Sequence, residues 1–239
     1  YGYGMQVLAE IGAEMELGSP EIFAVNIMSE DIHGEQYGFV LLLFSYLIEQ
    51  QSQVLCMSKP GIFEAMDLSL MNLNENSSTL AFGYDCSFNH IIQIAPSGIY
   101  AGKLRLSRTG KPEYNCSNST SLLWKVPKSK IAEHAVINDT NQSSISSSVN
   151  EVMCCLATQE EVYILSILEK SICMFTRIST LQPISALTLS GKYLAFAFWE
   201  TGEIKVYHQL SFNKESKREY NAPFSPCDCE MLCKSLSVT

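Results

Sequence analysis

Hydrophobic residues recur along the chain in short runs that suit β-strands. Some runs alternate apolar and polar side chains, as in a strand with one buried face, and others are continuously apolar, as in a strand buried on both faces. Turn-forming residues separate the runs, which follow one another at intervals of about 10–15 residues, a spacing typical of all-β proteins. The predicted strands are residues 5–11, 21–28, 39–48, 53–58, 79–84, 90–95, 99–106, 121–126, 152–157, 162–168, 172–178, 186–189, 193–199 and 203–209.

Helices contribute little to this pattern. Residues 10–17 could form one helical turn, but Gly12 and Gly18 weaken it. Strands and helices do not alternate along the chain, which argues against a parallel α/β sheet. Regularly spaced short strands favour a sandwich, a barrel or a propeller. We therefore predict an all-β fold.

The hairpin at residues 192–209 narrows this choice. Residues 193–199 are almost continuously apolar, Glu200-Thr201-Gly202 supplies a turn, and residues 204–208 alternate with period two. A strand buried on both faces beside a half-exposed strand is typical of a propeller blade. At ~40–45 residues per blade the chain would hold about five or six blades. The pattern is WD-repeat-like, although the Gly-His and Trp-Asp signatures of WD repeats are absent.

Polar stretches interrupt the strands and suggest the domain organisation. We assign residues 1–212 to part of a β-propeller, with loop insertions at residues 103–120 and 138–150, and residues 213–239 to a polar loop or tail. The chain begins at Tyr1 without a signal-peptide pattern, so we expect an interior piece of a longer protein. The longest apolar run is too short for a membrane-spanning helix, which needs ~20 residues, so no membrane partner is expected.

Charge and cysteine content limit the function classes. The 239 residues contain 16 Lys and Arg against 25 Asp and Glu, which gives a net charge of −9. This charge argues against a protein that binds duplex DNA by neutralising its phosphates. Lys103, Arg105 and Arg108 form a local basic stretch that could still contact nucleic acid. Nine cysteines, an odd number, mostly occupy apolar runs. They favour buried reduced thiols in an intracellular protein over a disulfide framework.

No catalytic or metal-binding motif is complete. Residues 98–104 resemble a phosphate-binding loop but are one residue short, with Leu104 where Ser or Thr holds magnesium. Cys227, Cys229 and Cys233 supply three thiols, whereas structural zinc needs four ligands. No histidine falls in a nucleophile motif, and no pair of carboxylates has a glycosidase-like setting. We expect no catalytic residue, no metal and no cofactor.

Several blocks of sequence carry a family resemblance. Residues 1–11 read YGYGMQVLAEI, residues 86–94 read CSFNHIIQI, and residues 124–127 read WKVP. Residues 194–212 contain the hairpin and end in Leu-Ser-Phe. In this order the blocks resemble the second propeller of a family of triple-propeller nuclear proteins. That family includes the large subunit of the UV-damaged-DNA-binding factor, the A subunit of the cleavage and polyadenylation specificity factor, and the large propeller subunit of splicing factor 3b.

The resemblance covers nearly the whole chain, with two departures. Ala197 stands where the family commonly has Gly, and Phe198 replaces the usual apolar residue before the tryptophan. The resemblance implies about five blades of a seven-bladed second propeller, located in the nucleus. It implies a non-enzymatic interaction scaffold, and Trp199 favours the branch that acts as a cullin-type ubiquitin ligase adaptor in DNA repair.

Two alternatives remain open at this point. One is a subunit of an mRNA 3′-end processing or splicing complex, with nucleic acid reached through the parent complex. The other is a propeller hydrolase or lyase, which would need carboxylates or histidines clustered on one loop face. Under the scaffold reading the partners are protein subunits, either a cullin or RNA-processing subunits. The predicted partner-binding residues are Trp199, Trp124, Lys103, Arg105 and Arg108.

Overall fold

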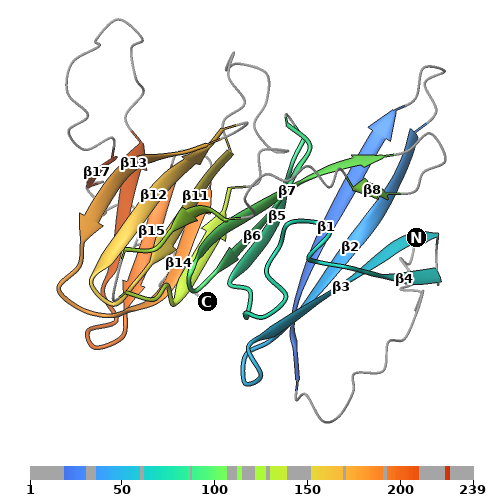
Figure 1. Ribbon diagram of the computed structural model, residues 1–239. Helices are drawn as coiled ribbons and strands as arrows, with labels where there is room; N and C mark the ends of the chain where they lie inside the picture. The colour runs from blue at the N-terminus through green and yellow to red at the C-terminus, as the bar shows by residue number, and fades with distance from the viewer. Residues whose placement is uncertain are drawn as a thin grey trace, which may run out of the picture. The chain divides into compact units, whose positions relative to one another are not determined.

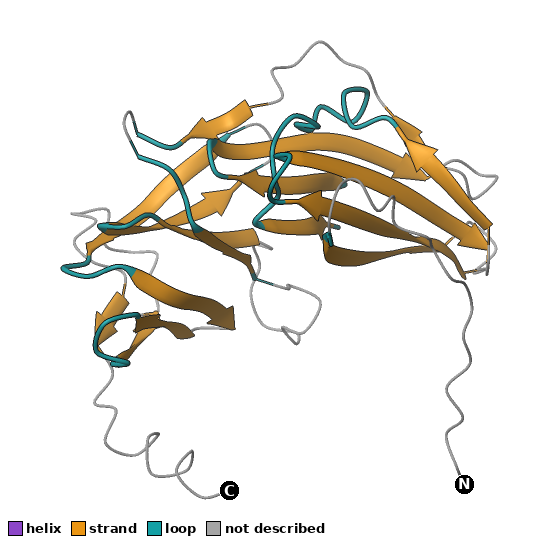
Figure 2. Cartoon of the chain, turned by 90° about the horizontal axis from the view of Figure 1, so that it is seen from below, coloured by secondary structure: helices purple, strands orange, loops and turns teal. Residues whose placement is uncertain are grey.

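Strands make up the regular structure of the part of the chain that can be described. The computed structural model describes residues 19–30, 36–59, 62–86, 88–106, 112–114, 122–127, 130–138, 152–168, 171–190, 193–209 and 224–226. These residues form strands joined by turns and loops (Figure 2), so the all-β prediction is confirmed. In the same residues no helix long and apolar enough to cross a membrane occurs.

The described strands fall into four antiparallel sheets, each of which follows the order of the chain (Figure 1). The first sheet contains β1 (Glu21–Glu30), β2 (Gln36–Tyr46), β3 (Gln51–Lys59) and β4 (Ile62–Met66). The second contains β5 (Ala81–Asp85), β6 (His90–Ala95), β7 (Gly98–Leu106) and β8 (Pro112–Tyr114), and β9 (Leu122–Lys125) also pairs with β7. The third contains β10 (His134–Ile137), β11 (Val152–Ala157), β12 (Glu161–Ile167) and β13 (Ile172–Ser179). The fourth contains β14 (Ile184–Ser190), β15 (Tyr193–Phe198), β16 (Ile204–Gln209) and β17 (Phe224–Pro226).

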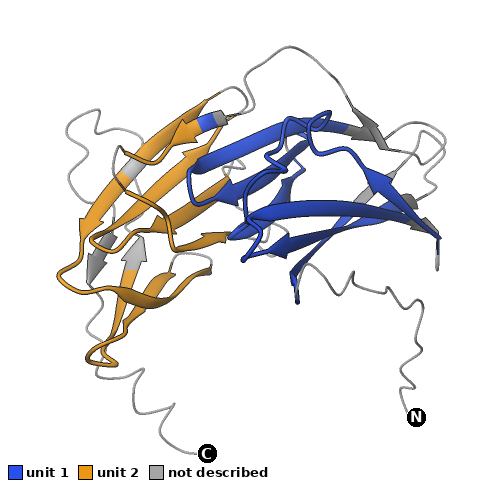
Figure 3. Cartoon of the chain, turned by 60° about the horizontal axis from the view of Figure 1, so that its bottom comes forward, with its two compact units in different colours: residues 1–123 blue, residues 124–239 orange. Residues whose placement is uncertain are grey.

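The chain divides into two compact units, residues 1–123 and 124–239 (Figure 3). In unit 1, the sheets β1–β4 and β5–β8 share one core. Alternate residues of β2 point to the same face, which brings Leu41 and Leu43 into that core with Phe82 and Ile91 of the second sheet. Their burial removes apolar surface from water, which is the main force that holds the two sheets together.

The connection between these two sheets, residues 67–80, also enters the core of unit 1. Leu68, Met71 and Leu73 are buried there. The backbone of Met71 approaches β7 at Gly102 so closely that a Cβ on Gly102 would lie 1.6 Å from Met71 O. A glycine is needed at this point because another stretch of backbone occupies the side-chain position.

In unit 2, the sheets β10–β13 and β14–β17 share the other core. Cys155 and Ile164 are register partners on β11 and β12, and they pack in a buried cluster with Leu194 and Phe196 of β15. Strand β12 is buried along its whole length, as expected for the continuous apolar run from which it was predicted. His134 Nε2 lies 2.9 Å from Ile184 O and links the first strands of the two sheets.

Strands that the sequence pattern missed lie at the ends of their sheets. They are β4, β8, β10 and β17. Strand β4 is only five residues long and reads Ile-Phe-Glu-Ala-Met, which does not alternate apolar and polar positions, and only Met66 is buried. Strand β8 lies inside the stretch predicted as a loop insertion at residues 103–120, and β17 lies inside the predicted tail. The structure therefore has strands where the sequence predicted loops. Strand β8 is ordered by pairing with β7, and β17 by pairing with β16, and their polar sequences give no sign of this pairing.

The number of blades stays a prediction. The four sheets begin at Glu21, Ala81, His134 and Ile184. The spacing from the start of one sheet to the start of the next is therefore longer than the ~40–45 residues expected for one blade. Long connections, such as residues 67–80, account for the wider spacing. A closed propeller is not shown by the described residues. Most of the predicted insertion at residues 138–150, and residues 1–11 with their family-like motif, lie outside them.

Candidate functional site

Trp199 stands on the tight turn between β15 and β16, and 70% of its surface is exposed. Phe198 N donates to Glu203 O at 3.0 Å, and Gly202 N donates to Phe198 O at 3.1 Å, so backbone hydrogen bonds close the turn. Gly202 has a φ of +66°, which glycine adopts at little cost. The hairpin therefore holds this large apolar side chain outward on a fixed backbone.

A second turn, residues 181–183, lies beside the tryptophan. Trp199 N donates to Pro183 O at 3.1 Å, and Thr201 Oγ1 donates to Gln182 Oε1 at 3.3 Å. The side chain of Leu181 on this turn is fully exposed. Residues 181–183 and 199–201 together form what we call the Leu181–Trp199 surface. Large apolar side chains gathered on the outside of a protein mark interaction sites.

Aromatic rings of β15 and β16 pack within the hairpin that carries Trp199. Phe196 and Phe198 meet edge to face with centroids 5.5 Å apart, and Phe196 stacks on Tyr207 at 5.4 Å. Lys205 Nζ lies 5.1 Å from the centroid of the Phe198 ring. The hairpin that carries Trp199 is thus already packed, so a partner would bind with little loss of conformational entropy in this part of the surface.

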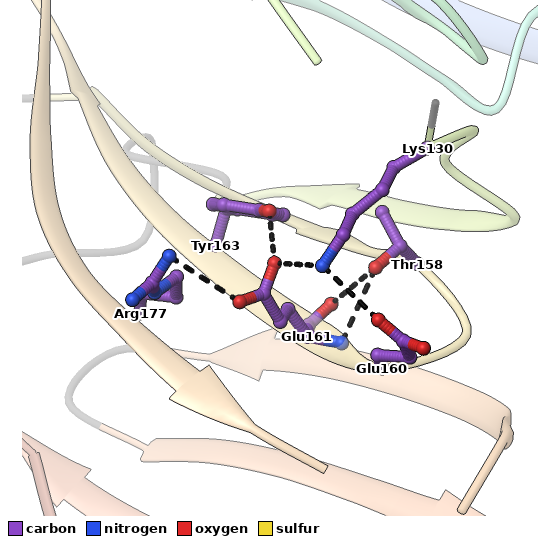
Figure 4. A network of polar contacts seen from close by, with 6 residues as sticks. All are labelled: Lys130, Thr158, Glu160, Glu161, Tyr163 and Arg177. Atoms are coloured by element: carbon purple, nitrogen blue, oxygen red, sulfur yellow. Dashed lines mark hydrogen bonds and ion pairs between the residues drawn. The ribbon is translucent and has the colours of Figure 1, made fainter. Parts of the chain in front are cut away.

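An ionic network lies at the neighbouring turn between β11 and β12 (Figure 4). The side chain of Glu161 is only 12% exposed, and its carboxylate receives Lys130 Nζ at 2.6 Å and Arg177 Nη1 at 3.3 Å. The Tyr163 hydroxyl also donates to this carboxylate. Lys130 Nζ further lies 3.2 Å from the carboxylate of Glu160. Two cations and a hydroxyl therefore compensate for the burial of one carboxylate.

The network shifts the ionisation of its members. The hydrogen bonds from Lys130 and Tyr163 hold the pKa of Glu161 below its usual value. The same contact with Glu161 raises the pKa of Lys130, so both groups are charged at neutral pH. Burial, with the hydrogen bond to Glu161, raises the pKa of Tyr163 to about 12. The arrangement stabilises a charged pair and offers no group poised to transfer protons near pH 7.

The remaining predicted partner-binding residues occupy different settings. Trp124 is half-buried, with its ring 5.4 Å from that of Tyr163, so it packs within unit 2. Lys103 is a half-buried register partner of His90, and Arg105 is the register partner of Glu113 on β8. Arg108 lies outside the described residues. Among the five predicted residues, Trp199 is the one that the structure describes as strongly exposed.

Sequence reasoning missed Leu181. A signal for it exists, because an isolated apolar residue precedes Pro183 in the short polar stretch Ser-Thr-Leu-Gln-Pro. Proline favours a turn at this point, and a turn residue has no sheet face on which to bury its side chain. An isolated leucine in such a turn is thus a candidate for a surface anchor.

A row of titratable residues crosses the second sheet. Asp85, His90 and Lys103 are register partners on β5, β6 and β7. Asp85 and His90 are buried, so neither can reach a substrate in solution as a general acid or base must. The row therefore gives no support to the hydrolase or lyase alternative.

The described part of the chain contains no grouped metal ligands and has three buried thiols. There, no three His, Cys, Asp or Glu side chains are grouped to hold a metal ion. Cys227, Cys229 and Cys233 lie outside that part. Cys56, Cys154 and Cys155 are buried free thiols, and burial raises the pKa of Cys56 to about 11. They fit the expected reduced core cysteines and are unreactive positions.

Comparison with known proteins adds little to this picture. No family model matches the chain, and no curated protein matches it. Among solved structures, the chain is similar to a protein from Lactobacillus plantarum, with 7% sequence identity and a TM-score of 0.48. The match covers 87% of this chain and 66% of that chain, so this chain spans slightly less than two thirds of that protein's length.

Proposed function

We propose that the chain is part of a β-propeller and acts as a non-enzymatic protein-interaction scaffold in a nuclear multi-subunit complex. Within that class, we propose a cullin-type ubiquitin ligase adaptor linked to DNA repair. The observation that carries the scaffold proposal is the exposed pair of Leu181 and Trp199 on two hydrogen-bonded turns of unit 2. The assignment to the ligase branch rests on the sequence resemblance.

The sheet organisation supports the propeller part of the proposal. Propeller blades are antiparallel four-stranded sheets that follow one another along the chain. The main path of each described sheet contains four strands in chain order, with β9 added beside β7 in the second sheet, and in each unit the two successive sheets share one core.

The Leu181–Trp199 surface supports the scaffold part. A solvent-exposed tryptophan on a rigid turn gains free energy when a partner removes it from water, and tryptophan is enriched among residues that dominate interfaces. Because the hairpin is already ordered by backbone hydrogen bonds and by the Phe196–Phe198 contact, binding does not need to fix the chain first.

The test is quantitative mass spectrometry of the complex formed by the full-length parent protein in its own cells. The variants are the double substitution Leu181→Ser with Trp199→Ala, and the matched control Ile48→Ser. Ile48 is 85% exposed on the turn between β2 and β3, so the control removes a similar apolar side chain elsewhere. We expect a cullin and its RING partner with the wild type and the control, and about tenfold less of both with the double variant.

Other outcomes would change the proposal in defined ways. Recovery of polyadenylation or splicing subunits in place of the cullin would move the protein to the RNA-processing alternative. Unchanged recovery with the double variant would show that the Leu181–Trp199 surface does not hold the partner.

A further inference from the structure

We infer that the partner bound by the Leu181–Trp199 surface is a protein segment that carries an aromatic or branched aliphatic side chain flanked by Lys or Arg. This inference rests on the proposed function and adds the chemistry of the partner to it. It follows from the charges placed around the two exposed apolar side chains.

Two carboxylates border the apolar residues, one on the Trp199 turn and one on the neighbouring turn between β11 and β12. Glu200 directly follows Trp199 and is exposed, and it has no ion-pair partner among the residues that the structure describes. The side chain of Glu160 is 74% exposed, and Glu160 O accepts a hydrogen bond from Thr180 N at 2.7 Å. Because Thr180 precedes Leu181, this bond places the Glu160 turn next to the apolar surface.

The nearby cations are already engaged with carboxylates, Glu160 among them. Lys130 is shared between Glu160 and Glu161, and Arg177 contacts Glu161. Lys205 Nζ lies 4.0 Å from Glu203 Oε1, next to the turn that carries Trp199. The border of the surface is therefore negative on balance, and a partner with positive charge is complementary to it.

The tryptophan itself favours the same partner. An indole ring attracts Lys and Arg side chains through its negative face, and an exposed ring is open to that contact. Leu181 offers only apolar contact, which suits an aliphatic or aromatic side chain. An apolar anchor and a flanking basic residue would therefore each find a matching group on the surface.

The experiment selects short random peptides by display on the full-length protein and measures the affinities of the enriched peptides by fluorescence anisotropy. Three substitutions report on the surface, namely Leu181→Ser, Trp199→Ala and Glu200→Lys. Two matched controls in unit 1 are Ile48→Ser and Glu21→Lys, both at exposed positions. Circular dichroism melts establish that each variant is folded.

We expect enriched peptides to combine an aromatic or branched aliphatic residue with net positive charge. Their affinity should fall about tenfold with Leu181→Ser or Trp199→Ala. It should fall several-fold with Glu200→Lys, and also when NaCl is raised to about 0.5 M, because salt screens exposed charges. The two controls should leave it unchanged.

The contrary outcomes separate this inference from the proposed function. The inference is overturned if the peptides lose affinity with Leu181→Ser and Trp199→Ala but are neutral or acidic. It is also overturned if their affinity is unchanged by Glu200→Lys. Either outcome leaves the scaffold proposal standing. Peptides whose affinity is unchanged by Leu181→Ser and Trp199→Ala bind elsewhere on the protein, which counts against both the inference and the scaffold proposal. Failure to enrich any binding sequence overturns the inference as well.

Discussion

The two units use topologically equivalent connections for opposite purposes. Residues 67–80 join the last strand of the first sheet to the first strand of the second, and residues 180–183 do the same for the third and fourth sheets. The longer connection folds inward and buries Leu68, whereas the shorter one leaves Leu181 fully exposed. A connection that is long enough to fold back can add to the core, and a short one can only bridge two strands.

The polar contacts at these connections differ as well. In unit 1, the buried amide of Gln93 donates to Thr79 Oγ1 at 2.8 Å and to Asn74 O at 3.0 Å, and it accepts from Asn74 N at 2.7 Å. These groups are uncharged. In unit 2, Thr180 N of the connection donates to Glu160 O at 2.7 Å, and the next residue, Glu161, holds its charged carboxylate between Lys130 and Arg177. The comparison teaches that one strand order can be secured either by neutral or by ionic contacts, with different responses to pH and salt.

The largest effect should come from Gly102→Ala in unit 1. The new Cβ would meet Met71 O at 1.6 Å, and the backbone of residues 67–80 would have to move. We expect a loss on the order of 3 kcal/mol in the free energy of unfolding, measured by urea titration. The control Gly202→Ala meets no atom within 4 Å and changes only a positive φ, so it should cost about 1 kcal/mol. Equal losses would contradict the close backbone approach.

A pair of leucines tests the contrast between the two connections directly. Leu68→Ala removes a buried side chain and should cost about 2–3 kcal/mol, because it leaves a cavity in the core of unit 1. Leu181→Ala removes an exposed side chain and should change stability by less than about 0.5 kcal/mol. Urea unfolding of both variants checks this, and a large loss for Leu181→Ala would mean that the turn is buried in the folded protein.

Gln93→Leu tests the neutral network. The substitution leaves Asn74 N and Asn74 O without their buried partner, so we expect a loss of about 2 kcal/mol that is the same from about pH 5 to pH 8. Ser97→Ala is the control, since its exposed hydroxyl contact with Tyr100 at 3.0 Å contributes little. A loss that varied with salt would argue against a purely neutral network.

Glu161→Gln tests the ionic network and should have the smallest effect of the four, about 1–2 kcal/mol at pH 7. Folding lowers the pKa of Glu161 below its ordinary value, so the carboxylate stabilises the protein fully above that ordinary value. This stabilisation is lost as the pH falls through the lowered pKa of the folded state. The difference between wild type and variant should therefore disappear in acid. The control Glu21→Gln, at an exposed position, should change stability little at pH 7. Urea midpoints measured from neutral pH into acid check this, and a constant difference would contradict it.

Much of the fold could be predicted from the sequence, and the strands that the prediction missed share one feature, their position at the edge of a sheet. Strands such as β6 and β12 bury both faces, so their apolar runs identify them without any tertiary information. Strand β4 buries only Met66, and its order depends on pairing with β3. A short edge strand of this kind shows no clear period in its sequence, so its pairing with a neighbour decides where it lies.

The candidate site was only partly predictable for a similar reason. Trp199 was predicted from the family resemblance of its hairpin, but its exposure depends on how the turn after β15 is closed. Trp124 has the same chemistry, yet it packs on Tyr163. Nothing in the local sequence separates the two tryptophans, because burial depends on residues that are distant along the chain.

By itself, the sequence determined the all-β class, the central strands and the chemistry available at each turn, because these follow from local hydrophobic period and from turn residues. Tertiary structure alone decided that Leu181 and Trp199 lie on adjoining turns, that Gly102 faces the backbone of Met71, and that Lys130 and Arg177 meet at Glu161. The physical reason is that each of these contacts joins residues from different elements, and its geometry exists only after the sheets have paired and packed.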